Sequence, residues 1–569
     1  MFAGSMALRG TTDTPPALMT RQEIIKRLDK EAWCDVLVVG GGIHGATFAH
    51  LAAFNGFRTV LLERGDYAEG TSSRSSKLAH GGIRYLEHFD FRQVYEGIRS
   101  RQGLYSIAPH LVRAHDFVAP LQKGENFEKL KMWAGLCLYS LMAKGQVPFP
   151  RWTSAVEGLG LESLGGWRYS DGIMSDTRLV IERVIAARQE GALCLNYAET
   201  ELMLSNPKGV DVRWKQTLTG SETSQHNIRA GIVVNCAGPW VSSAGGMSTR
   251  ALDGKLRYSR GAHLLFPSRW PGPALVMPLR AGGRRIPGRY YFVTPHPAGT
   301  LLGTTEREVS LAERDPLPSV DEVRELLQYV RADLKASPLA AGAPHYCFAG
   351  VRSLPVDTGR RASDTAALSR KHSWNYSNGV LSLVGGKYTT AAWTCWQGMK
   401  ILLRYCERPG IVLSVGGRPL PGAAALPERL QEFHAACEAA NVPQDLRAQA
   451  ISRLGGRVVK LLEYPDGLES VAGVALKGEV RLARDTEQAE TVEDFMRRRL
   501  ELEYFQNHGL SALPSVAYFL VSDAGKSTLD VERDAEFYRT RIGALGELLK
   551  KCVPVQDTLS VIAHSPLGL

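Results

Sequence analysis

The stretch TSSRSSKLAHGGIRYLEHFDF, from Thr71 to Phe91, concentrates side chains that bind anions or move protons. Its first half is small and polar, and hydroxyl groups of this kind hydrogen-bond phosphate and sugar oxygens. Its second half brings a lysine, a histidine, two glycines, an arginine and a tyrosine close together. Histidine titrates near neutral pH and can therefore take up and release a proton under ordinary conditions. This composition is typical of a loop that binds an anionic ligand and assists proton transfer.

A nucleotide-binding pattern lies directly upstream of this loop. Residues 35–39 form a short apolar, β-branched run, which predicts a buried parallel strand. It leads into GGGIHG (Gly40 to Gly45), a helical segment at 46–54 and a second strand at 58–62, which ends before Glu63. The order strand, G-x-G-x-x-G, helix, strand and acid is typical of a dinucleotide site.

Each residue of this pattern has a physical role. Gly40 permits the tight turn, Gly42 lets the backbone approach a pyrophosphate, and Gly45 lets the helix pack closely on the sheet. The helix N-terminus offers free N–H groups and the positive end of its dipole to phosphates. We expect Glu63 to accept a hydrogen bond from a ribose hydroxyl. The remaining candidates here are Ile43, His44 and Arg64, with a surface position as the alternative for Arg64.

Two later segments repeat the transition from an apolar strand to glycine. They lie at 232–240 and 380–390, and the second runs into a helix near Tyr388. Each alone is typical of an ordinary strand-to-helix turn, but together with the first motif they predict FAD held by separate segments of a discontinuous domain. The candidate cofactor contacts in these segments are Ala237, Gly238, Trp240, Gly385, Gly386, Lys387 and Thr389.

The loop at 71–91 follows Glu63 closely, so we expect it to lie beside the dinucleotide. Its hydroxyl groups would bind phosphate and ribityl oxygens, and its basic residues would face the flavin ring and the substrate. The cofactor candidates within it are Thr71, Ser72, Ser76, Lys77, His80, Gly81 and Gly82.

These segments together resemble the FAD-dependent glycerol-3-phosphate dehydrogenase family. The resemblance rests on GGGIHGA and the loop at 71–91, on YSDGIMSDTRLV (Tyr169 to Val180) and on VVNCAGPWV. It rests further on RGAHLLFP (Arg260 to Pro267) and on AGVRSLP with LVGGKYTT. The matches extend from about Asp35 to Ala391, roughly two thirds of the chain. H-G-G-x-R-Y-L-E is specific, because oxidases of the wider superfamily share the glycines and lack it.

The resemblance implies an α/β fold. It implies a discontinuous Rossmann-like FAD-binding domain of the D-amino-acid-oxidase type, an inserted α+β substrate domain and an all-α C-terminal domain. We expect an N-terminal extension at 1–30, the oxidoreductase region at 31–410 and the helical domain at 415–550. The FAD-binding segments would cover about 31–115, 170–240 and 350–410, with the substrate domain between them.

The resemblance also implies a reaction, the oxidation of sn-glycerol 3-phosphate by FAD with quinone as the electron acceptor. His80 and His263 are the candidate bases, and Lys387 would stabilise negative charge on the reduced flavin or bind phosphate. The phosphate group calls for arginine, which binds two oxygens at once, so Arg84 and Arg352 are the candidates, with Tyr85 as a further donor. Arg260 and Arg289 are secondary candidates.

Three positions depart from the family pattern and leave the substrate open. Glu306 ends GTTE where the family has aspartate, His296 replaces an aromatic residue, and Ser353 replaces a proline. The alternatives are another polyol phosphate such as erythritol 4-phosphate, an oxygen-using glycerophosphate oxidase, an amine oxidase and a non-catalytic flavoprotein. The interval from Gly303 to Arg352 is short for the oxidase's insertion, which favours the dehydrogenase.

The composition is that of a globular protein with an anionic partner or a solvated basic surface. The 569 residues are enough for two or more domains, and the net charge is +10. No nucleic-acid-binding signature occurs. The nine cysteines are scattered without a C-x-x-C pair, which argues against a disulfide framework or a metal site and indicates a reducing compartment. The first residues do not read as a secretory signal, which favours a cytoplasmic protein. The family resemblance implies peripheral association with the inner face of the cytoplasmic membrane.

Two segments bear on membrane contact and oligomerisation. Met132–Ala143 is apolar but too short to span a bilayer, which favours a buried core helix over a membrane-surface anchor. Arg497, Arg498 and Arg499 predict a solvated or acid-paired face, with anionic lipid or a homodimer contact as the alternative. The surrounding chain predicts helices at Pro427–Ala440, Asp445–Leu462 and Asp530–Lys550, and Thr491 begins a capping-box pattern.

Overall fold

The computed structural model describes residues 18–83, 90–154, 156, 165–218, 225–246, 256–281, 284–310, 313–335, 337–355, 372–406, 413–414 and 417–553. Of the residues proposed above, Arg84 and Tyr85 lie outside these ranges.

The nucleotide-binding strands are neighbours in one parallel sheet. Strand β1 (Trp33–Val39) lies between β10 (Gln225–Asn235) and β2 (Thr59–Leu62), β18 (Val380–Val384) flanks β10, and β7 (Leu193–Leu195) flanks β2. Three strands far apart in the sequence therefore stand side by side in the order β18-β10-β1. Because they are parallel, the glycine turns that follow them meet at the same carboxyl edge of the sheet, which is where doubly wound folds bind nucleotides.

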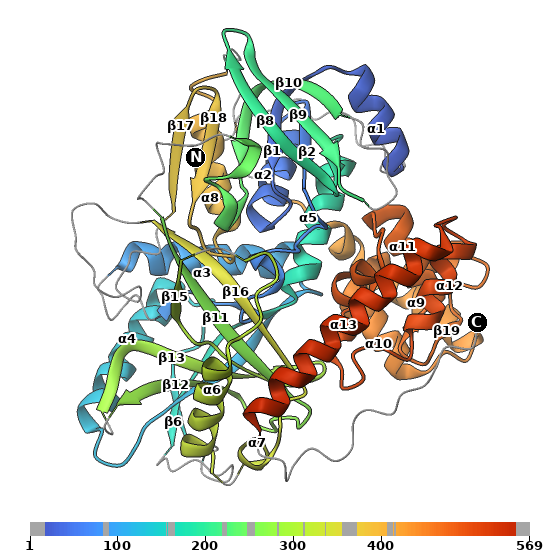
Figure 1. Cartoon of the computed structure of the whole chain (residues 1–569). Helices are drawn as coiled ribbons and strands as arrows, with labels where there is room; N and C mark the ends of the chain where they lie inside the picture. Colours follow the sequence, from blue (N-terminus) through green and yellow to red (C-terminus); the bar gives the residue numbers. More distant parts are fainter. Residues whose placement is uncertain are drawn as a thin grey trace.

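Helices and antiparallel strands complete this part of the molecule (Figure 1). Helices α2 (Ile43–Phe54), α5 (Asp176–Gln189) and α8 (Ala391–Leu402) share one apolar core with the sheet. Helix α1 (Arg21–Lys30) packs in a separate core with the antiparallel strands β8 (Ala198–Asn206) and β9 (Gly209–Gln216). A further antiparallel strand, β17 (Ser373–Ser377), pairs with β18.

A second sheet lies beneath the first in Figure 1 and is mostly antiparallel. Its strands are β3 (Leu78–Ala79), β4 (Val112–Pro120), β5 (Arg151–Thr153), β6 (Gly166–Met174), β11 (Leu256–Phe266), β12 (Ala274–Ala281), β13 (Arg284–His296), β14 (Gly299–Gly303), β15 (Arg307–Val309) and β16 (Tyr346–Pro355). Strands β3, β4 and β6 come from the chain before the middle nucleotide segment. The chain therefore alternates between the two sheets more finely than the three expected segments imply.

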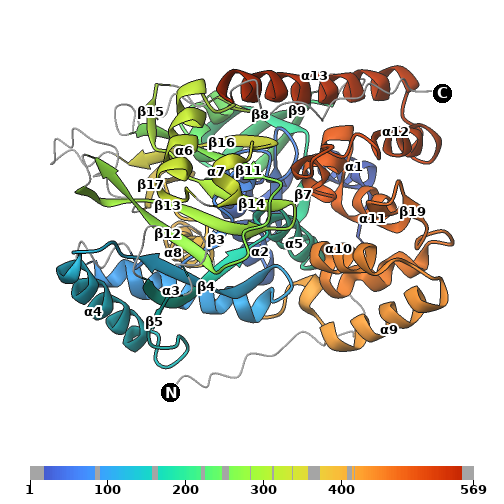
Figure 2. The same ribbon diagram turned by 90° about the horizontal axis from the view of Figure 1, so that it is seen from below.

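Helices cover both sides of the second sheet (Figure 2). Helices α6 (Val320–Asp333) and α7 (Pro338–Ala341) share an apolar core with β11, β13 and β14. On the other side lie α3 (Phe91–Ile107) and α4 (Asn126–Met142).

The expectation that Met132–Ala143 is a buried core helix is wrong. Within α4, Leu136, Tyr139 and Ser140 are buried, whereas Trp133, Leu138 and Leu141 are exposed. The run is apolar around the whole helix circumference, but α4 packs on one side only, against α3 and β6. Its outer apolar face is left on the surface. No helix among the described residues is long and apolar enough to cross a membrane.

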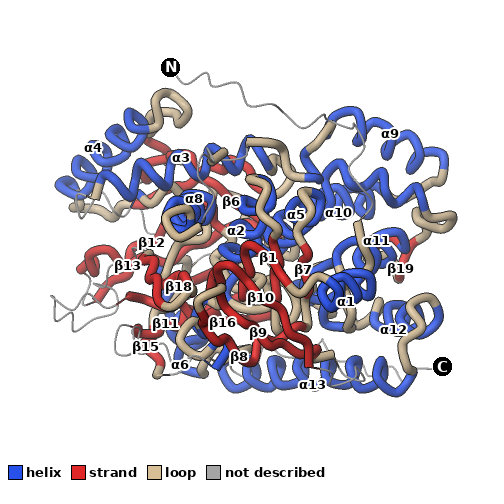
Figure 3. Tube along the Cα trace, turned by 90° about the horizontal axis from the view of Figure 1, so that it is seen from above, coloured by secondary structure: helices blue, strands red, loops and turns tan. Residues whose placement is uncertain are grey.

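Most of the C-terminal helical region, residues 426–553, lies to one side of both sheets, and its last helix extends along α6 and β16 of the second sheet (Figure 3). Its elements are α9 (Leu426–Ala439), α10 (Gln444–Leu454), the 3-10 helix η9 (Gly455–Glu463), α11 (Lys477–Glu487), the π-helix η10 (Asp494–Arg499), the 3-10 helix η11 (Leu502–Tyr504), α12 (Leu513–Ser522) and α13 (Thr528–Cys552). A hairpin of two-residue strands, β19 (Ser470–Val471) and β20 (Ala475–Leu476), is added to them. The helix expected at Asp445–Leu462 changes to 3-10 geometry at Gly455. The α/β fold class expected from the sequence, with its helical C-terminal part, is confirmed.

The three consecutive arginines of η10 are not a solvated or lipid-binding face. Arg498 and Arg499 are buried and both contact Asp66, which follows the nucleotide-binding strand β2. Arg497 contacts Glu503 and Asp315. The expected pairing with acids is therefore correct, and the acids come from several parts of the chain.

Candidate active site

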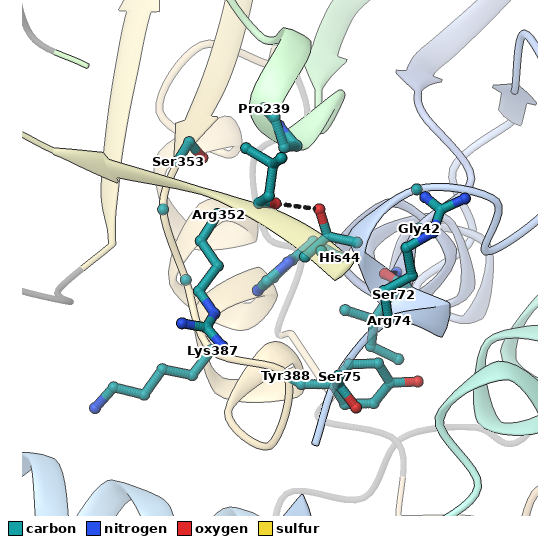
Figure 4. Close-up of a pocket in the computed structure, with 18 of the residues that line it drawn as sticks. Gly42, His44, Ser72, Arg74, Ser75, Pro239, Arg352, Ser353, Lys387 and Tyr388 are labelled. Atoms are coloured by element: carbon teal, nitrogen blue, oxygen red, sulfur yellow. Dashed lines mark hydrogen bonds between the residues drawn. The ribbon is translucent and has the colours of Figure 1, made fainter. Parts of the chain in front are cut away.

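A cavity of about 770 Å³ is lined by the carboxyl edge of the first sheet, by the second sheet and by α4. Figure 4 shows part of its lining. Of the residues proposed from the sequence, those that line it are Gly40, Gly42, Ile43, His44, Glu63, Arg64, Thr71, Ser72, Ser76, His80, Gly82, Ala237, Gly238, Trp240, Arg289, Arg352, Gly385, Gly386, Lys387 and Thr389. The proposed residues Gly45, Lys77, Gly81, Arg260 and His263 are not part of this lining.

The glycine turn after β1 leaves no space for side chains. Gly40 has φ +103°, and a Cβ there would lie 2.7 Å from the Cys236 carbonyl oxygen. A Cβ at Gly45 would lie 1.8 Å from the Gly40 carbonyl oxygen. Ser72 Oγ accepts a hydrogen bond from the Ile43 N–H at 2.9 Å, which occupies one donor of the first turn of α2. Gly42, Ile43 and His44 line the cavity, so this helix N-terminus faces it, as a pyrophosphate site requires.

The other end of the nucleotide site is built by Glu63 and Arg64. The Glu63 carboxylate accepts hydrogen bonds from the N–H groups of Gly41 (2.5 Å) and Gly65 (2.9 Å). Burial raises the pKa of Glu63, and these two bonds oppose that effect. The Arg64 guanidinium lies 4.4 Å from the Trp240 ring centre, which gives this end an amphipathic wall.

A serine–histidine pair, Ser76 and His263, lies at one end of the cavity, which we call the catalytic end. Ser76 Oγ and His263 Nε2 are hydrogen-bonded at 2.9 Å, and Ser76 lines the cavity. His263 is a cross-strand partner of Phe348, and the two rings stack with centres 4.8 Å apart. Burial, followed by the nearby Arg352 and Lys77 cations, holds the pKa of His263 well below its usual range. His263 is therefore a neutral imidazole that reaches the cavity through Ser76.

His80, in contrast, lines the cavity itself. It follows the short strand β3, and the next residue is fixed by a hydrogen bond from the Gly81 N–H to Asp171 Oδ1 at 3.0 Å. Asp171 is in turn held by Arg101 and by the Gly172 N–H. The loop that carries His80 is thus anchored to β6.

Two cations lie at the same end of the cavity (Figure 4). Arg352, on β16, has its Nη2 3.4 Å from Thr304 Oγ1. Lys387, in the turn after β18, donates to Gln93 Oε1 on α3. A planar guanidinium and an ammonium are the donors that suit a phosphate group.

The three departures from the family pattern have different surroundings. Ser353 and Glu306 line the cavity. His296 does not: its ring lies edge-on to Tyr504, with centres 5.1 Å apart, and burial lowers its pKa to about 3. Of the three positions, His296 is therefore a packing residue and not a candidate for substrate contact.

Sequence reasoning missed an apolar arm of the cavity. This arm lies between α4 and the second sheet, and its lining comprises Ile83, Met132, Leu136, Tyr169, Val276, Leu279, Tyr290 and Phe292. Tyr169 and Asp171 lie in YSDGIMSDTRLV, a family motif whose residues have no role assigned from the sequence. The α4 residues carry no local signal, since apolar residues at these positions are also typical of an ordinary core.

The cavity has the features that FAD requires. A buried imidazole nitrogen, His44 Nε2, has no hydrogen-bond partner among the described residues, and a Cβ on Gly386 would lie 2.7 Å from it. Burial lowers the pKa of His44 to about 4, so the ring is neutral and has one donor and one acceptor nitrogen. An unsatisfied buried imidazole nitrogen, a helix N-terminus and glycine turns face the same cavity, as expected for a bound dinucleotide. No cluster of three metal-ligating side chains occurs in the described part of the chain.

Comparison with known proteins identifies the protein family to which this chain belongs. The model of the DAO family, described as FAD dependent oxidoreductase, matches residues 35–392, which is more than half of the chain. The chain therefore belongs to this family of FAD dependent oxidoreductases, and FAD is its cofactor.

Several individual proteins similar to this chain are named glycerol-3-phosphate dehydrogenase. A glycerol-3-phosphate dehydrogenase of Pseudomonas aeruginosa is 33% identical over 491 residues, which cover 83% of this chain and 92% of the relative. A glycerol-3-phosphate dehydrogenase of Synechocystis is 28% identical over 544 residues, covering 89% of this chain and 95% of the relative. The X-ray structure of the glycerol-3-phosphate dehydrogenase from Bacillus halodurans complexed with FAD has the same fold. It gives a TM-score of 0.73 at 23% identity and covers 94% of this chain and 99% of that chain.

Proposed function

We propose that this protein oxidises sn-glycerol 3-phosphate to dihydroxyacetone phosphate. The observation that carries the proposal is that His80, Arg352 and Lys387 line the same cavity as the FAD-binding turns. A base and two cations are what the oxidation of a phosphorylated secondary alcohol requires. The names of the relatives support the same substrate.

The roles of the residues follow from their positions. Bound FAD supplies the hydride acceptor, N5 of the flavin. His80 removes the proton of the C2 hydroxyl, since it lines the cavity directly. Arg352 and Lys387 bind the phosphate and thereby orient C2. His263 acts through Ser76, because its Nε2 is engaged with that hydroxyl and its burial disfavours the imidazolium. Arg84 and Tyr85 remain proposed substrate contacts.

The decisive experiment is anaerobic reduction of the FAD-loaded protein by sn-glycerol 3-phosphate. We expect prompt bleaching of the visible flavin band. His80→Gln should slow this reduction by roughly 10²–10⁴-fold, the usual contribution of a general base. His434→Gln is the matched control, because His434 is exposed on α9. Absence of bleaching in the unaltered protein, with FAD bound, would refute the substrate, and erythritol 4-phosphate and amino acids would be tried next.

Quinone is the proposed electron acceptor. The apolar arm of the cavity supports this, because a lipophilic ring needs an apolar path toward the flavin. Met132→Trp, which adds bulk in this arm, should slow electron transfer to a soluble quinone analogue. It should leave flavin reduction by glycerol 3-phosphate unchanged. Equal rates of electron transfer to the analogue in Met132→Trp and in the unaltered protein would contradict the apolar arm as the path of the quinone. Rapid reoxidation of the flavin by air would indicate an oxidase instead.

The outer face of α4 is the proposed membrane contact, at the inner face of the cytoplasmic membrane. Phe127, Leu130, Trp133 and Leu141 are 75%, 62%, 43% and 63% exposed, and Phe149 beyond the helix is 56% exposed. An apolar patch of this kind next to the apolar arm would let a membrane-dissolved quinone enter the cavity.

Vesicle flotation tests this contact. The double variant Leu130→Glu/Leu141→Glu should lose binding to vesicles that contain anionic lipid. Tyr518→Glu/Phe537→Glu is the matched control, since these residues are also exposed, 68% and 62%, but lie on α12 and α13. Equal flotation of the two double variants would rule out α4 as the contact.

A further inference from the structure

The C-terminal helical region places one aromatic side chain behind the catalytic end of the cavity. Tyr504, at the end of η11, is buried and packs against rings of the second sheet. Its ring centre lies 5.4 Å from that of Tyr346 and 6.3 Å from that of Phe348, the residue on which His263 stacks. The C-terminal helical region has no catalytic motif of its own, but through Tyr504 it contacts Phe348, the residue that supports His263 of the serine–histidine pair.

The Tyr504 hydroxyl also binds Lys77, the residue that follows Ser76. The Lys77 ammonium donates to Asp176 Oδ1, to the Ser73 carbonyl oxygen at 2.8 Å and to Tyr504 Oη at 3.1 Å. An ammonium group has three N–H donors, so these three acceptors satisfy it fully. The ammonium is buried and cannot exchange any of them for water without movement of the loop.

The backbone at Lys77 shows why this anchoring matters. Lys77 has φ +56°, a left-handed conformation that side chains with a Cβ adopt rarely. Its N–H donates to Ser75 Oγ at 3.0 Å, and Ser75 Oγ donates to Asp176 Oδ2 at 2.6 Å. The direction of the neighbouring Ser76 side chain depends on this backbone conformation, and the anchored ammonium holds it in place.

We propose that Tyr504 is a positioning residue: by holding Lys77 and packing on Phe348, it keeps the hydroxyl of Ser76 and the ring of His263 aligned toward the substrate. The C-terminal helical region is then part of the active-site support. This inference rests on the proposed function for its kinetic consequences, although the alignment itself does not depend on the substrate. Tyr504 is not among the described residues that line the cavity, so it acts through its neighbours.

A double-mutant cycle of Tyr504→Phe and Lys77→Met tests the proposal in the FAD-loaded enzyme. Tyr504→Phe removes the hydroxyl and keeps the packed ring. We expect it to slow flavin reduction at saturating glycerol 3-phosphate by about tenfold, with the apparent Kd of the substrate changed by less than about twofold. Lys77→Met should cost at least as much, and the double variant should be no slower than Lys77→Met, because both changes break the same contact.

Tyr464→Phe is the matched control. Tyr464 belongs to the same region, and its hydroxyl donates to Asp485 Oδ2 at 2.9 Å, a pair within that region. This variant should reduce its flavin at the unaltered rate. Multiplying losses in the double variant, an unaltered rate in Tyr504→Phe, or an equal loss in Tyr464→Phe would each overturn the proposal.

The visible circular dichroism of bound FAD separates this proposal from the substrate assignment. The flavin band should change shape in Tyr504→Phe and Lys77→Met and remain unaltered in Tyr464→Phe. If glycerol 3-phosphate fails to bleach the unaltered protein, the substrate is wrong and the dichroism still decides the positioning role. Identical bands in all variants would refute that role.

Discussion

The side chains at the catalytic end differ in their access to the cavity, and their proposed roles follow from this difference. His80, Ser76 and Arg352 line it, whereas His263 stands one hydrogen bond behind Ser76. A base must touch the proton that it removes, so position favours His80, and the strongly disfavoured imidazolium of His263 points the same way. Two histidines that were equivalent as sequence candidates thus acquire different roles.

The serine–histidine pair gives a prediction at this scale. Ser76→Ala and His263→Gln should slow flavin reduction by similar factors, about tenfold each, and the double variant should be no slower than either single variant. The reason is that each change removes the same hydrogen bond. Stopped-flow absorbance at the flavin band measures it. A much larger loss in His263→Gln than in Ser76→Ala would show that His263 acts on the substrate directly.

Arg352 gives a second prediction. Arg352→Gln should raise the apparent Kd of glycerol 3-phosphate by roughly 10–100-fold, the range for loss of a hydrogen bond to a charged group. The reduction of the flavin by unphosphorylated glycerol should be equally poor in both proteins, because that substrate has no phosphate to bind. Titration of each substrate under anaerobic conditions tests this. An unchanged Kd for glycerol 3-phosphate would exclude Arg352 from phosphate binding.

At the scale of elements, the π-helix η10 joins the C-terminal helical region to the nucleotide-binding sheet. Asp66 follows β2 and accepts from Arg498 Nε at 2.5 Å and from both Arg499 Nη atoms at 2.7 and 2.8 Å. Asn196 donates to Asp66 as well, at 3.0 Å. The turn that begins at Glu63 is therefore fixed from behind by the C-terminal helical region.

Asp66→Asn should accordingly destabilise the protein by about 3 kcal/mol, because it leaves buried guanidinium groups without their counter-charge. Loss of FAD on dilution should increase at the same time, since Glu63 lies in the same turn. Urea denaturation and released flavin fluorescence measure the two effects. Asp116→Asn is the matched control: its partner Arg168 is exposed, and such pairs contribute less than about 1 kcal/mol. Similar effects of both changes would contradict the role of Asp66.

Across the whole molecule, buried neutral histidines make stability depend on pH. Burial lowers the pKa of His50 to about 3, of His110 to about 4 and of His296 to about 3, against about 6.5 in the unfolded chain. The unfolded chain then binds more protons below pH 6.5, so stability is present above this value and falls as the pH decreases. Each histidine should cost about 1 kcal/mol between pH 7 and pH 5.5. A melting temperature that stays constant over this range, at constant ionic strength, would contradict this account.

The sequence alone was sufficient to predict those features that depend on interactions between residues close together in the chain. The glycine turn between β1 and α2, the acid at Glu63 and the later glycine segments each depend on residues a few positions apart, because backbone torsions, strand runs and helix N-termini are local properties. The same holds for the helices α9 and α13, which lie within two residues of their expected bounds. FAD and the α/β class follow from these patterns.

The tertiary structure decided what depends on partners far along the chain. Arg498 and Arg499 are buried because Asp66, more than 400 residues away, lies opposite them. His263 has a proposed supporting role because Ser76 comes between it and the cavity, and α4 is a surface helix because nothing described packs on its outer face. Composition and periodicity indicate which side chains of a segment can be buried. Only the tertiary structure determines which other part of the chain packs against that segment, because burial and charge compensation arise from contacts between distant segments.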